Sequence, residues 1–232
     1  MAQVFGGVGH RRLLRRSSAA GALGFPFLLA GCGGRLSTLD PAGPAALGIA
    51  RLWWAMLAGS SLIFAVVLTL FAVLMLRPEA GRRIPARRWI VWGGIALPLP
   101  VILAVTGTAL WQGEALRAGP PALRIEAEAY MWGWRFAYPP ATGLPPTEGV
   151  LHLPAGQEVE MVVTSPDVIH SFWIPRLGGK IDAIPGHANT LRLRADAPGD
   201  YGGVCAEYCG IGHVDMSFTA RAHAIWPPED LP

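Results

Sequence analysis

Residues 205–216 read Cys-Ala-Glu-Tyr-Cys-Gly-Ile-Gly-His-Val-Asp-Met, which places two thiols, an imidazole and a thioether within twelve positions. Another imidazole, His170, lies upstream in the stretch Asp-Val-Ile-His-Ser-Phe-Trp. Thiolates and thioethers are soft ligands that select copper over magnesium or calcium. One Cys, two His and a weak Met make a mononuclear blue-copper set, and a second Cys lets two thiolates bridge two metal ions. The pattern predicts a copper electron-transfer site whose ligands are Cys205, Cys209, His170, His213 and Met216.

Three other interpretations remain open for these residues. A disulfide between Cys205 and Cys209 would suit an oxidising compartment, but it leaves the two histidines and the methionine without a role. Structural zinc would use two Cys and two His, but it has no need of Met216. His170 alone would pass for an ordinary strand histidine. The other histidines after residue 120 are expected to have no special role: His152, His187 and His223.

The segment 1–31 has the pattern of an export signal. Four arginines at positions 11, 12, 15 and 16 precede an apolar stretch, 19–30, that is too short to span a bilayer. The stretch ends in Leu29-Ala30-Gly31-Cys32, which resembles the lipobox of bacterial lipoproteins. That resemblance implies cleavage before Cys32 and a lipid on its thiol, with 32–51 as an N-terminal segment in the periplasm. The alternative is a chance cysteine in a leader.

Two uncharged apolar runs follow, 52–76 and 89–111, and each is long enough to cross a bilayer as a helix. Pro98 and Pro100 are expected to kink the second one. The loop 77–88 between them carries five arginines, and positive loops stay in the cytoplasm. The sequence thus predicts a transmembrane hairpin, 52–111, in a bacterial inner membrane, with the N-terminus and the large C-terminal part on the periplasmic side.

The net charge of +3 hides a strong asymmetry between the two parts of the chain. Residues 1–119 hold twelve arginines and three acidic residues, whereas 120–232 hold seven basic and thirteen acidic residues. The acidic C-terminal part argues against nucleic acid as a partner and suits a positively charged one.

Short alternating segments separated by Gly and Pro predict strands in the C-terminal part, with no helix between them. This pattern indicates an all-β domain, 120–232, folded as a sandwich or Greek-key barrel. The expected strands are 123–130, 150–153, 159–164, 189–194 and 217–225.

Several stretches together resemble subunit II of cytochrome c oxidase over about residues 50–226. They are the two cysteine- and histidine-bearing segments quoted above, Asp182-Ala-Ile-Pro-Gly, and the aromatic run Trp132-Gly-Trp134-Arg-Phe-Ala-Tyr138. The resemblance implies a membrane-anchored all-β protein, in which a transmembrane hairpin precedes a cupredoxin-like Greek-key β-barrel.

The resemblance also implies a binuclear copper centre, CuA. Cys205 and Cys209 would bridge two copper ions, His170 and His213 would be terminal ligands, and Met216 a weak ligand. Glu207 would bind copper through its backbone carbonyl, and its side chain would reach a magnesium ion shared with subunit I, with Asp182 near that contact. Trp132 matches the position where electrons enter.

The implied function is that of the electron-accepting subunit of a proton-translocating terminal oxidase. It takes electrons from a c-type cytochrome and passes them to haem in subunit I, where oxygen is reduced to water. Two alternatives are a quinol-oxidase subunit II, which lacks the copper ligands, and a membrane-tethered copper-binding or copper-delivery protein. The family often has a carboxylate at the start of the second helix, where this chain has Arg87-Arg88-Trp89. No proton-uptake role is therefore assigned.

Overall fold

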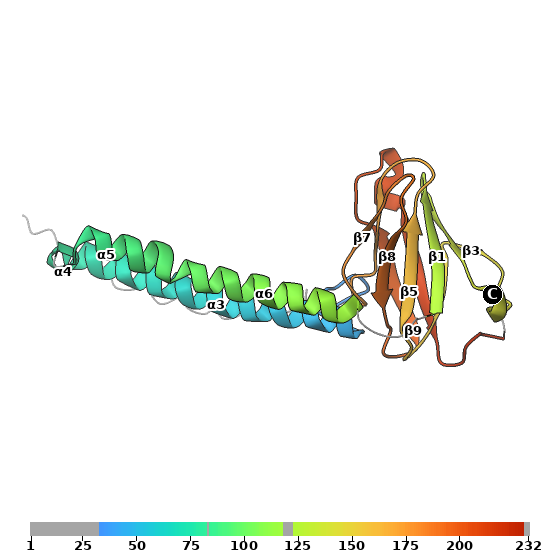
Figure 1. The fold of residues 1–232 in the computed structure, drawn as a ribbon, viewed down its shortest axis with the longest axis horizontal. Coiled ribbons are helices and arrows are strands. Elements are labelled where there is room, and N and C mark those ends of the chain that lie inside the picture. The colour runs from blue at the N-terminus through green and yellow to red at the C-terminus, as the bar shows by residue number, and fades with distance from the viewer. Residues whose placement is uncertain (1–32, 83, 118–122, 230–232) are drawn as a thin grey trace, which may run out of the picture.

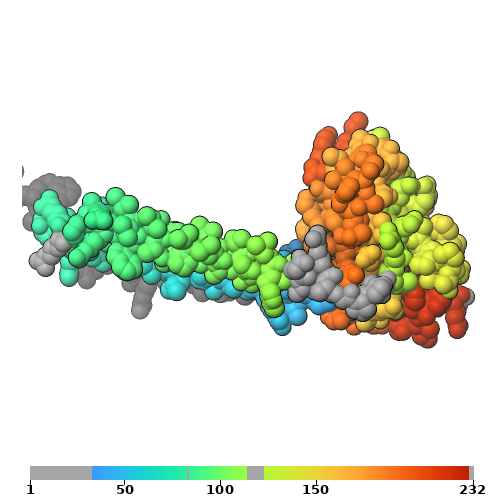
Figure 2. Space-filling view, in the orientation of Figure 1, coloured from blue at the N-terminus to red at the C-terminus, as the bar shows by residue number. Residues whose placement is uncertain are grey.

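The computed structural model describes residues 33–82, 84–117 and 123–229, with no side-chain description for 114–117. The predicted export signal, 1–31, and the predicted lipidation site, Cys32, lie outside these residues. The described chain consists of a long helical hairpin joined at one end to a β-domain (Figures 1 and 2).

The hairpin pairs the helix α3, Pro44–Leu76, with a second rod made of α5, Ala86–Val91, a π-helix, Trp92–Ala96, and α6, Pro98–Arg117. A short helix, α4, Pro78–Arg82, lies at the far tip. Two stretches, Pro44–Leu76 and Ala86–Gly113, are long and apolar enough to cross a membrane. The two predicted apolar runs are thus both helical.

The first helix begins eight residues earlier than the sequence predicted, so 44–51 belong to α3 and not to a separate segment. Pro44 stands in the first turn, where a missing N–H is no loss. Ala45, Ala46 and Ala50 are buried, and the Ala46 N–H donates to the Leu177 carbonyl of the β-domain at 3.3 Å. Contact with the domain therefore extends the helix beyond its lipid-facing part. The predicted loop 77–88 likewise contains α4 and the start of α5.

The irregularity expected at Pro98 and Pro100 lies just before them. Residues Trp92–Ala96 form a π-helical turn, and α6 begins at Pro98. A proline ring inside a helix clashes with the carbonyl four residues earlier, so the preceding turn widens and the next helix starts at the proline.

Two five-stranded sheets form the β-domain, with strand orders β3-β2-β1-β5-β8 and β4-β10-β9-β6-β7. Most neighbours are antiparallel, but β1 pairs with β5, and β4 with β10, in parallel. The strands are β1 Leu123–Tyr130, β2 Gly133–Ala137, β3 Thr147–Glu148, β4 Val150–Pro154, β5 Val159–Thr164, β6 His170–Trp173, β7 Ile181–Ala183, β8 Asn189–Leu193, β9 Gly199–Cys205 and β10 Ser217–His223. The cupredoxin-like all-β domain expected from the sequence is confirmed.

Four aromatic side chains fill the space between the sheets: Trp134, Phe136, Phe172 and Phe218. Phe218 lies 5.1 Å from Phe172 and 5.3 Å from Trp134, measured between ring centroids. A Cβ at Gly203 would collide with the Phe218 ring, so β9 must have glycine opposite this residue. The aromatic core supports β6 and β9, the strands that carry the predicted copper ligands His170 and Cys205.

The segment before α3 ties the hairpin to the domain. The Ala42 N–H donates to the Arg176 carbonyl at 2.7 Å, and the Ala42 carbonyl accepts from the Asp196 N–H at 2.9 Å. Asp40 and Arg176 form an ion pair of 3.0 Å. These backbone bonds fix how the domain sits on the helices.

Two histidines assigned no special role by the sequence form a pair at the β4–β10 junction. His152 Nδ1 lies 2.8 Å from His223 Nε2, and their rings stack with centroids 5.1 Å apart. Burial lowers the pKa of both histidines below the ordinary 6.5, and the nearby Arg221 lowers both further. Both rings are thus disposed to stay neutral, with the N–H of one ring donating a hydrogen bond to the bare nitrogen of the other.

This pair predicts a loss of stability in mild acid. The unfolded chain takes up protons below about pH 6.5, whereas the folded pair resists them, so unfolding becomes easier as the pH falls through that value. Thermal unfolding of the metal-free full chain between pH 8 and pH 5 should show a falling midpoint. The fall should be smaller in His223→Gln and unchanged in His187→Gln, whose histidine is exposed. Equal pH dependence in both variants would contradict the assignment.

Candidate metal centre

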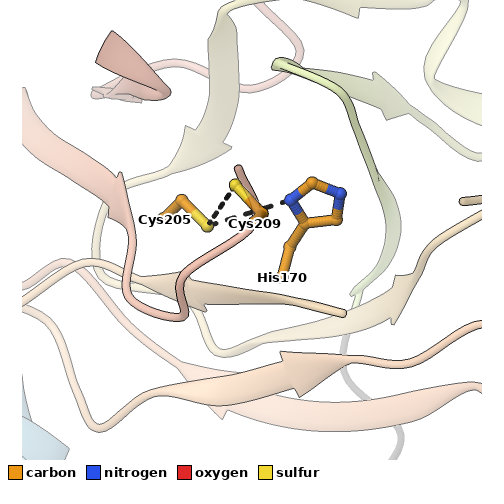
Figure 3. Close-up of side chains that lie close together, drawn as sticks. All are labelled: His170, Cys205 and Cys209. Carbon is orange, nitrogen blue, oxygen red and sulfur yellow. Dashed lines mark hydrogen bonds between the residues drawn. The ribbon is translucent and has the colours of Figure 1, made fainter. Parts of the chain in front are cut away.

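The copper ligands predicted from residues 170–216 converge at one end of the sandwich. Cys205 ends β9, His170 begins β6, and Cys209 lies on the loop between β9 and β10. The two sulfur atoms are 3.8 Å apart, and Cys205 Sγ lies 3.9 Å from His170 Nδ1 (Figure 3). All three residues are buried, and their ligand atoms lie within 4.8 Å of one another.

The remaining predicted ligands complete the site from the same loop. Cys209 Sγ lies 3.7 Å from His213 Nδ1 and 3.7 Å from Met216 Sδ. Cys205 Sγ lies 3.2 Å from the Glu207 carbonyl oxygen. Each cysteine sulfur thus has one imidazole and one weaker donor beside it, which is the symmetry that two bridged metal ions require.

Backbone bonds hold the ligand loop closed. The Cys205 N–H donates to the Met216 carbonyl at 2.9 Å, joining the two ends of the loop, and the Ala206 N–H donates to the Ser171 carbonyl of β6 at 2.9 Å. Gly210 has φ +117°, a conformation that other residues rarely adopt. The loop is therefore shaped by the backbone.

The two cysteines are free thiols, so the structure does not contain the disulfide considered above. Burial and the neighbouring Cys205 raise the pKa of Cys209 to about 11. A thiol that resists ionisation in a buried pocket needs a cation to become a thiolate, and metal ions supply that charge. The donor set of two sulfurs, two imidazoles, a thioether and a carbonyl fits copper better than zinc, which has no use for the thioether.

Asp167 holds His170 in place, a role that the sequence analysis did not assign. Its Oδ1 lies 2.8 Å from His170 Nε2, which leaves Nδ1 facing the sulfur atoms. Burial would raise the pKa of Asp167, but hydrogen bonds from His170, Val168 N–H, Met131 N–H and Ser165 outweigh it and lower this pKa to about 2. The three-residue spacing between Asp167 and His170 was the available signal.

Removing this carboxylate should weaken the site without unfolding the domain. Partners that orient a metal-binding histidine typically contribute about 10- to 100-fold in metal affinity. Asp167→Asn should therefore lower copper affinity by about that factor in a competition titration and change the visible spectrum of the loaded chain. The matched control is Asp215→Asn, an exposed residue on the ligand loop. An unaltered spectrum and affinity in Asp167→Asn would show that the contact is structural only.

Trp132 lies directly on the ligand loop. Its Nε1–H donates to the Cys209 carbonyl at 3.1 Å, and its ring packs so closely on Gly212 that a Cβ there would collide with it. The preceding Met131 N–H donates to Asp167 Oδ2 at 2.7 Å, so one carboxylate bridges the tryptophan loop and His170. Trp132 is 44% exposed. It therefore links the solvent surface to a predicted metal ligand.

The residues predicted for magnesium lie near each other but form no cluster among the described residues. Asp182 on β7 pairs with Ser171 on β6, the same residue that binds Ala206 next to Glu207. The Glu207 carboxylate lies 3.9 Å from the Lys180 ammonium. The magnesium assignment therefore stays a prediction.

An apolar rim surrounds the ligand loop, which the sequence analysis did not predict. Large apolar side chains are exposed from three segments, and those on the ligand loop are the most exposed. The rim consists of Met131, Trp132, Val168, Ile169, Tyr208, Ile211 and Val214. In Figure 1 this end of the sandwich stands to one side of the hairpin axis.

Comparison with known proteins agrees with this site. Residues 123–223 match the family model described as the periplasmic domain of cytochrome c oxidase subunit II. Cytochrome c oxidase subunit 2 of Alkalihalophilus pseudofirmus is 34% identical over 84% of this chain and 61% of its own length. Ubiquinol oxidase subunit 2 of Acetobacter aceti is 33% identical over 91% of this chain and 72% of its own length. The chain belongs to the subunit II family of haem–copper oxidases.

Among solved structures, this chain is similar to the periplasmic domain of subunit II of cytochrome oxidase from Bradyrhizobium japonicum. The two chains are 32% identical over 45% of this chain and 86% of the solved chain, and they superpose with a TM-score of 0.43. Since this chain spans 61% of the first relative's length, and the relatives include both cytochrome c and quinol oxidases, the substrate must be argued from the site.

Proposed function

We propose that this chain is the electron-accepting subunit of a cytochrome c oxidase, anchored in a bacterial inner membrane with its β-domain in the periplasm. The observation that carries the proposal is the convergence of four donors around two cysteine sulfur atoms 3.8 Å apart. A pair of copper ions held there would accept one electron at a time and pass it to haem in subunit I. A quinol-oxidase subunit II lacks these ligands, so their presence in this chain favours a cytochrome c oxidase.

The chain's own residues prepare the site for fast electron transfer. His170 and both cysteines are almost completely buried, which excludes water from the donor atoms. Asp167 fixes the orientation of His170, and the backbone bonds of the loop fix the sulfur positions. A rigid, dry set of ligands limits rearrangement when the charge of the centre changes. Delivery proteins exchange their metal and keep their ligands accessible, so the buried site opposes the copper-delivery alternative.

The apolar rim around Trp132 supports a docking surface for the donor. It includes an exposed indole that is hydrogen-bonded to the Cys209 carbonyl, and the exposed Asp215 lies on the same ligand loop. We propose that apolar contacts hold a basic c-type cytochrome, while the acidic domain steers it. The lateral position of this end suits a domain that overhangs subunit I (Figure 1).

The proposal is tested by copper content, spectroscopy and co-purification. The full chain should bind two copper ions, and the loaded site should show a mixed-valence EPR signal with hyperfine splitting from two equivalent nuclei. A haem-containing subunit should purify with it, and the complex should oxidise a reduced c-type cytochrome. One copper ion per chain, or a complex that oxidises only quinol, would contradict the proposal.

Turnover with a basic cytochrome should fall as salt rises, because attraction between surface charges is screened over about 10 Å at 0.1 M ionic strength. Steady-state rates between low and high salt measure this. The uncharged rim should leave a residual rate at high salt. A rate that does not change with salt would remove the electrostatic part of the docking proposal and leave the apolar part.

A further inference from the structure

A cavity of about 710 Å³ lies between the hairpin and the β-domain. Figure 1 shows that the hairpin meets the domain away from the ligand loop. One wall comes from the start of α3 and the end of α6, and the other from β5, β7 and β8. The helical wall is apolar apart from Gln112. Among the lining residues that the structure describes, the charged ones are Glu160 and Arg192 on the domain wall. The cavity thus combines an apolar side with a charged side.

The cavity lies at the level where phospholipid headgroups meet the periplasm. The second apolar stretch ends at Gly113, and Trp111 and Gln112 of its last turn line the cavity. Trp111, Trp53 and Trp54 are exposed at this end of the hairpin, and indole rings favour the membrane interface. A molecule filling the cavity would therefore have its polar part beside the domain and its apolar part beside the helices.

The charged wall contains a hydrogen-bond donor without an acceptor. Arg192 and Glu160 are cross-strand partners, with Nε 3.4 Å from Oε2. Arg192 Nη1 is buried and has no hydrogen-bond partner among the residues that the structure describes. A buried guanidinium N–H without an acceptor is costly, so such a group usually marks a missing partner. Arg192 lines the cavity, but Nη1 itself is covered, so the guanidinium must turn toward the cavity for Nη1 to reach an oxygen of a ligand there.

We propose that this junction cavity binds one phosphatidylethanolamine molecule. Its phosphate would accept from Arg192 Nη1, its ammonium would face the Glu160 carboxylate, and its acyl chains would lie against Ile49, Leu52 and Trp111. A zwitterionic headgroup matches a wall that carries one charge of each sign. A purely anionic headgroup would place uncompensated negative charge beside Glu160. Such a lipid would wedge the domain against the hairpin and does not depend on the copper site.

Native mass spectrometry of the full chain, released from nanodiscs of equimolar phosphatidylethanolamine and phosphatidylglycerol, tests this. The wild-type chain should retain one phosphatidylethanolamine, favoured about tenfold over phosphatidylglycerol. Arg192→Gln should lower that retention about tenfold. The matched control is Arg194→Gln on the same edge, whose guanidinium is exposed and pairs with Asp196 at 2.8 Å. Its retention should equal the wild type.

A second variant guards against misfolding of the first. Glu160→Gln/Arg192→Gln keeps a neutral hydrogen-bonding pair on the two strands, and circular dichroism checks its fold. If the folded double variant retains the lipid like the wild type, the proposal is wrong. It is also wrong if the wild type retains both lipids equally, or if the assembled oxidase retains none because another subunit fills the cavity.

Discussion

Replacing Cys209 by serine is expected to remove the binuclear copper signal and nearly all cytochrome c oxidation. Cys209 Sγ lies within 3.8 Å of three other donors of the site: Cys205 Sγ, His213 Nδ1 and Met216 Sδ. A serine oxygen is a hard donor with a shorter reach and cannot replace a soft thiolate shared by two ions. Since loss of a partner beside a ligand already costs about 10- to 100-fold, loss of a bridging ligand should cost more than a hundredfold in activity.

The measurements are copper content, EPR spectrum and turnover of the purified complex. The fold should survive, because Cys209 forms no disulfide and its loop is closed by the Cys205–Met216 backbone bond. Ser217→Ala, an exposed change just after the loop, is the matched control and should leave all three unchanged. A mixed-valence signal in Cys209→Ser would show that the two sulfurs do not share the metals.

Met216 provides a contrast within the same site. It is buried and approaches only one of the two sulfurs. A weak outer ligand tunes a copper centre more than it holds the metal. We therefore expect the cysteines to hold the metals and the thioether to adjust their potential.

The sequence predicted the strands whose pattern is local. Residues 123–130 and 159–164 alternate over six residues or more, and β1 and β5 have those bounds. Five strands were not predicted: β2, β3, β6, β7 and β9. The strands β3, β6 and β7 are short, and β9 contains three glycines. Their pairing is set by the aromatic core, including the Gly203–Phe218 contact, and such long-range packing leaves no periodic signal in the chain.

The convergence of the candidate ligands could be anticipated because copper restricts which residue types can serve, and four of the six donors lie within residues 205–213. The residues that support these ligands could not be predicted from the sequence. Asp167 is a common residue in a turn, and only the fold brings it to His170 and to Met131. The His152–His223 pair and the Arg192 cavity depend in the same way on which strands become neighbours.

Trp132 is the residue on which the docking proposal depends, and its replacement is the second large effect expected. Trp132→Ala should lower the rate of electron uptake from a c-type cytochrome at least about tenfold while both copper ions remain. The indole has an exposed face and an N–H bonded to the Cys209 carbonyl at 3.1 Å, so it joins the docking surface to a metal ligand. It supplies no ligand atom, so copper content should not change.

Two further variants separate the possible roles of Trp132. Trp132→Phe keeps an aromatic ring over Gly212 but loses the hydrogen bond, so an intermediate rate would assign part of the effect to that bond. Met131→Leu changes the neighbouring rim residue, which is similarly exposed at 47%, and should leave the rate near that of the wild type. Stopped-flow mixing with reduced cytochrome measures the rate, and EPR verifies the centre. Because the same loop also reaches Asp167, a changed EPR spectrum in Trp132→Ala would mean that the indole positions ligands. An unchanged rate would mean that electrons enter the site elsewhere on the rim.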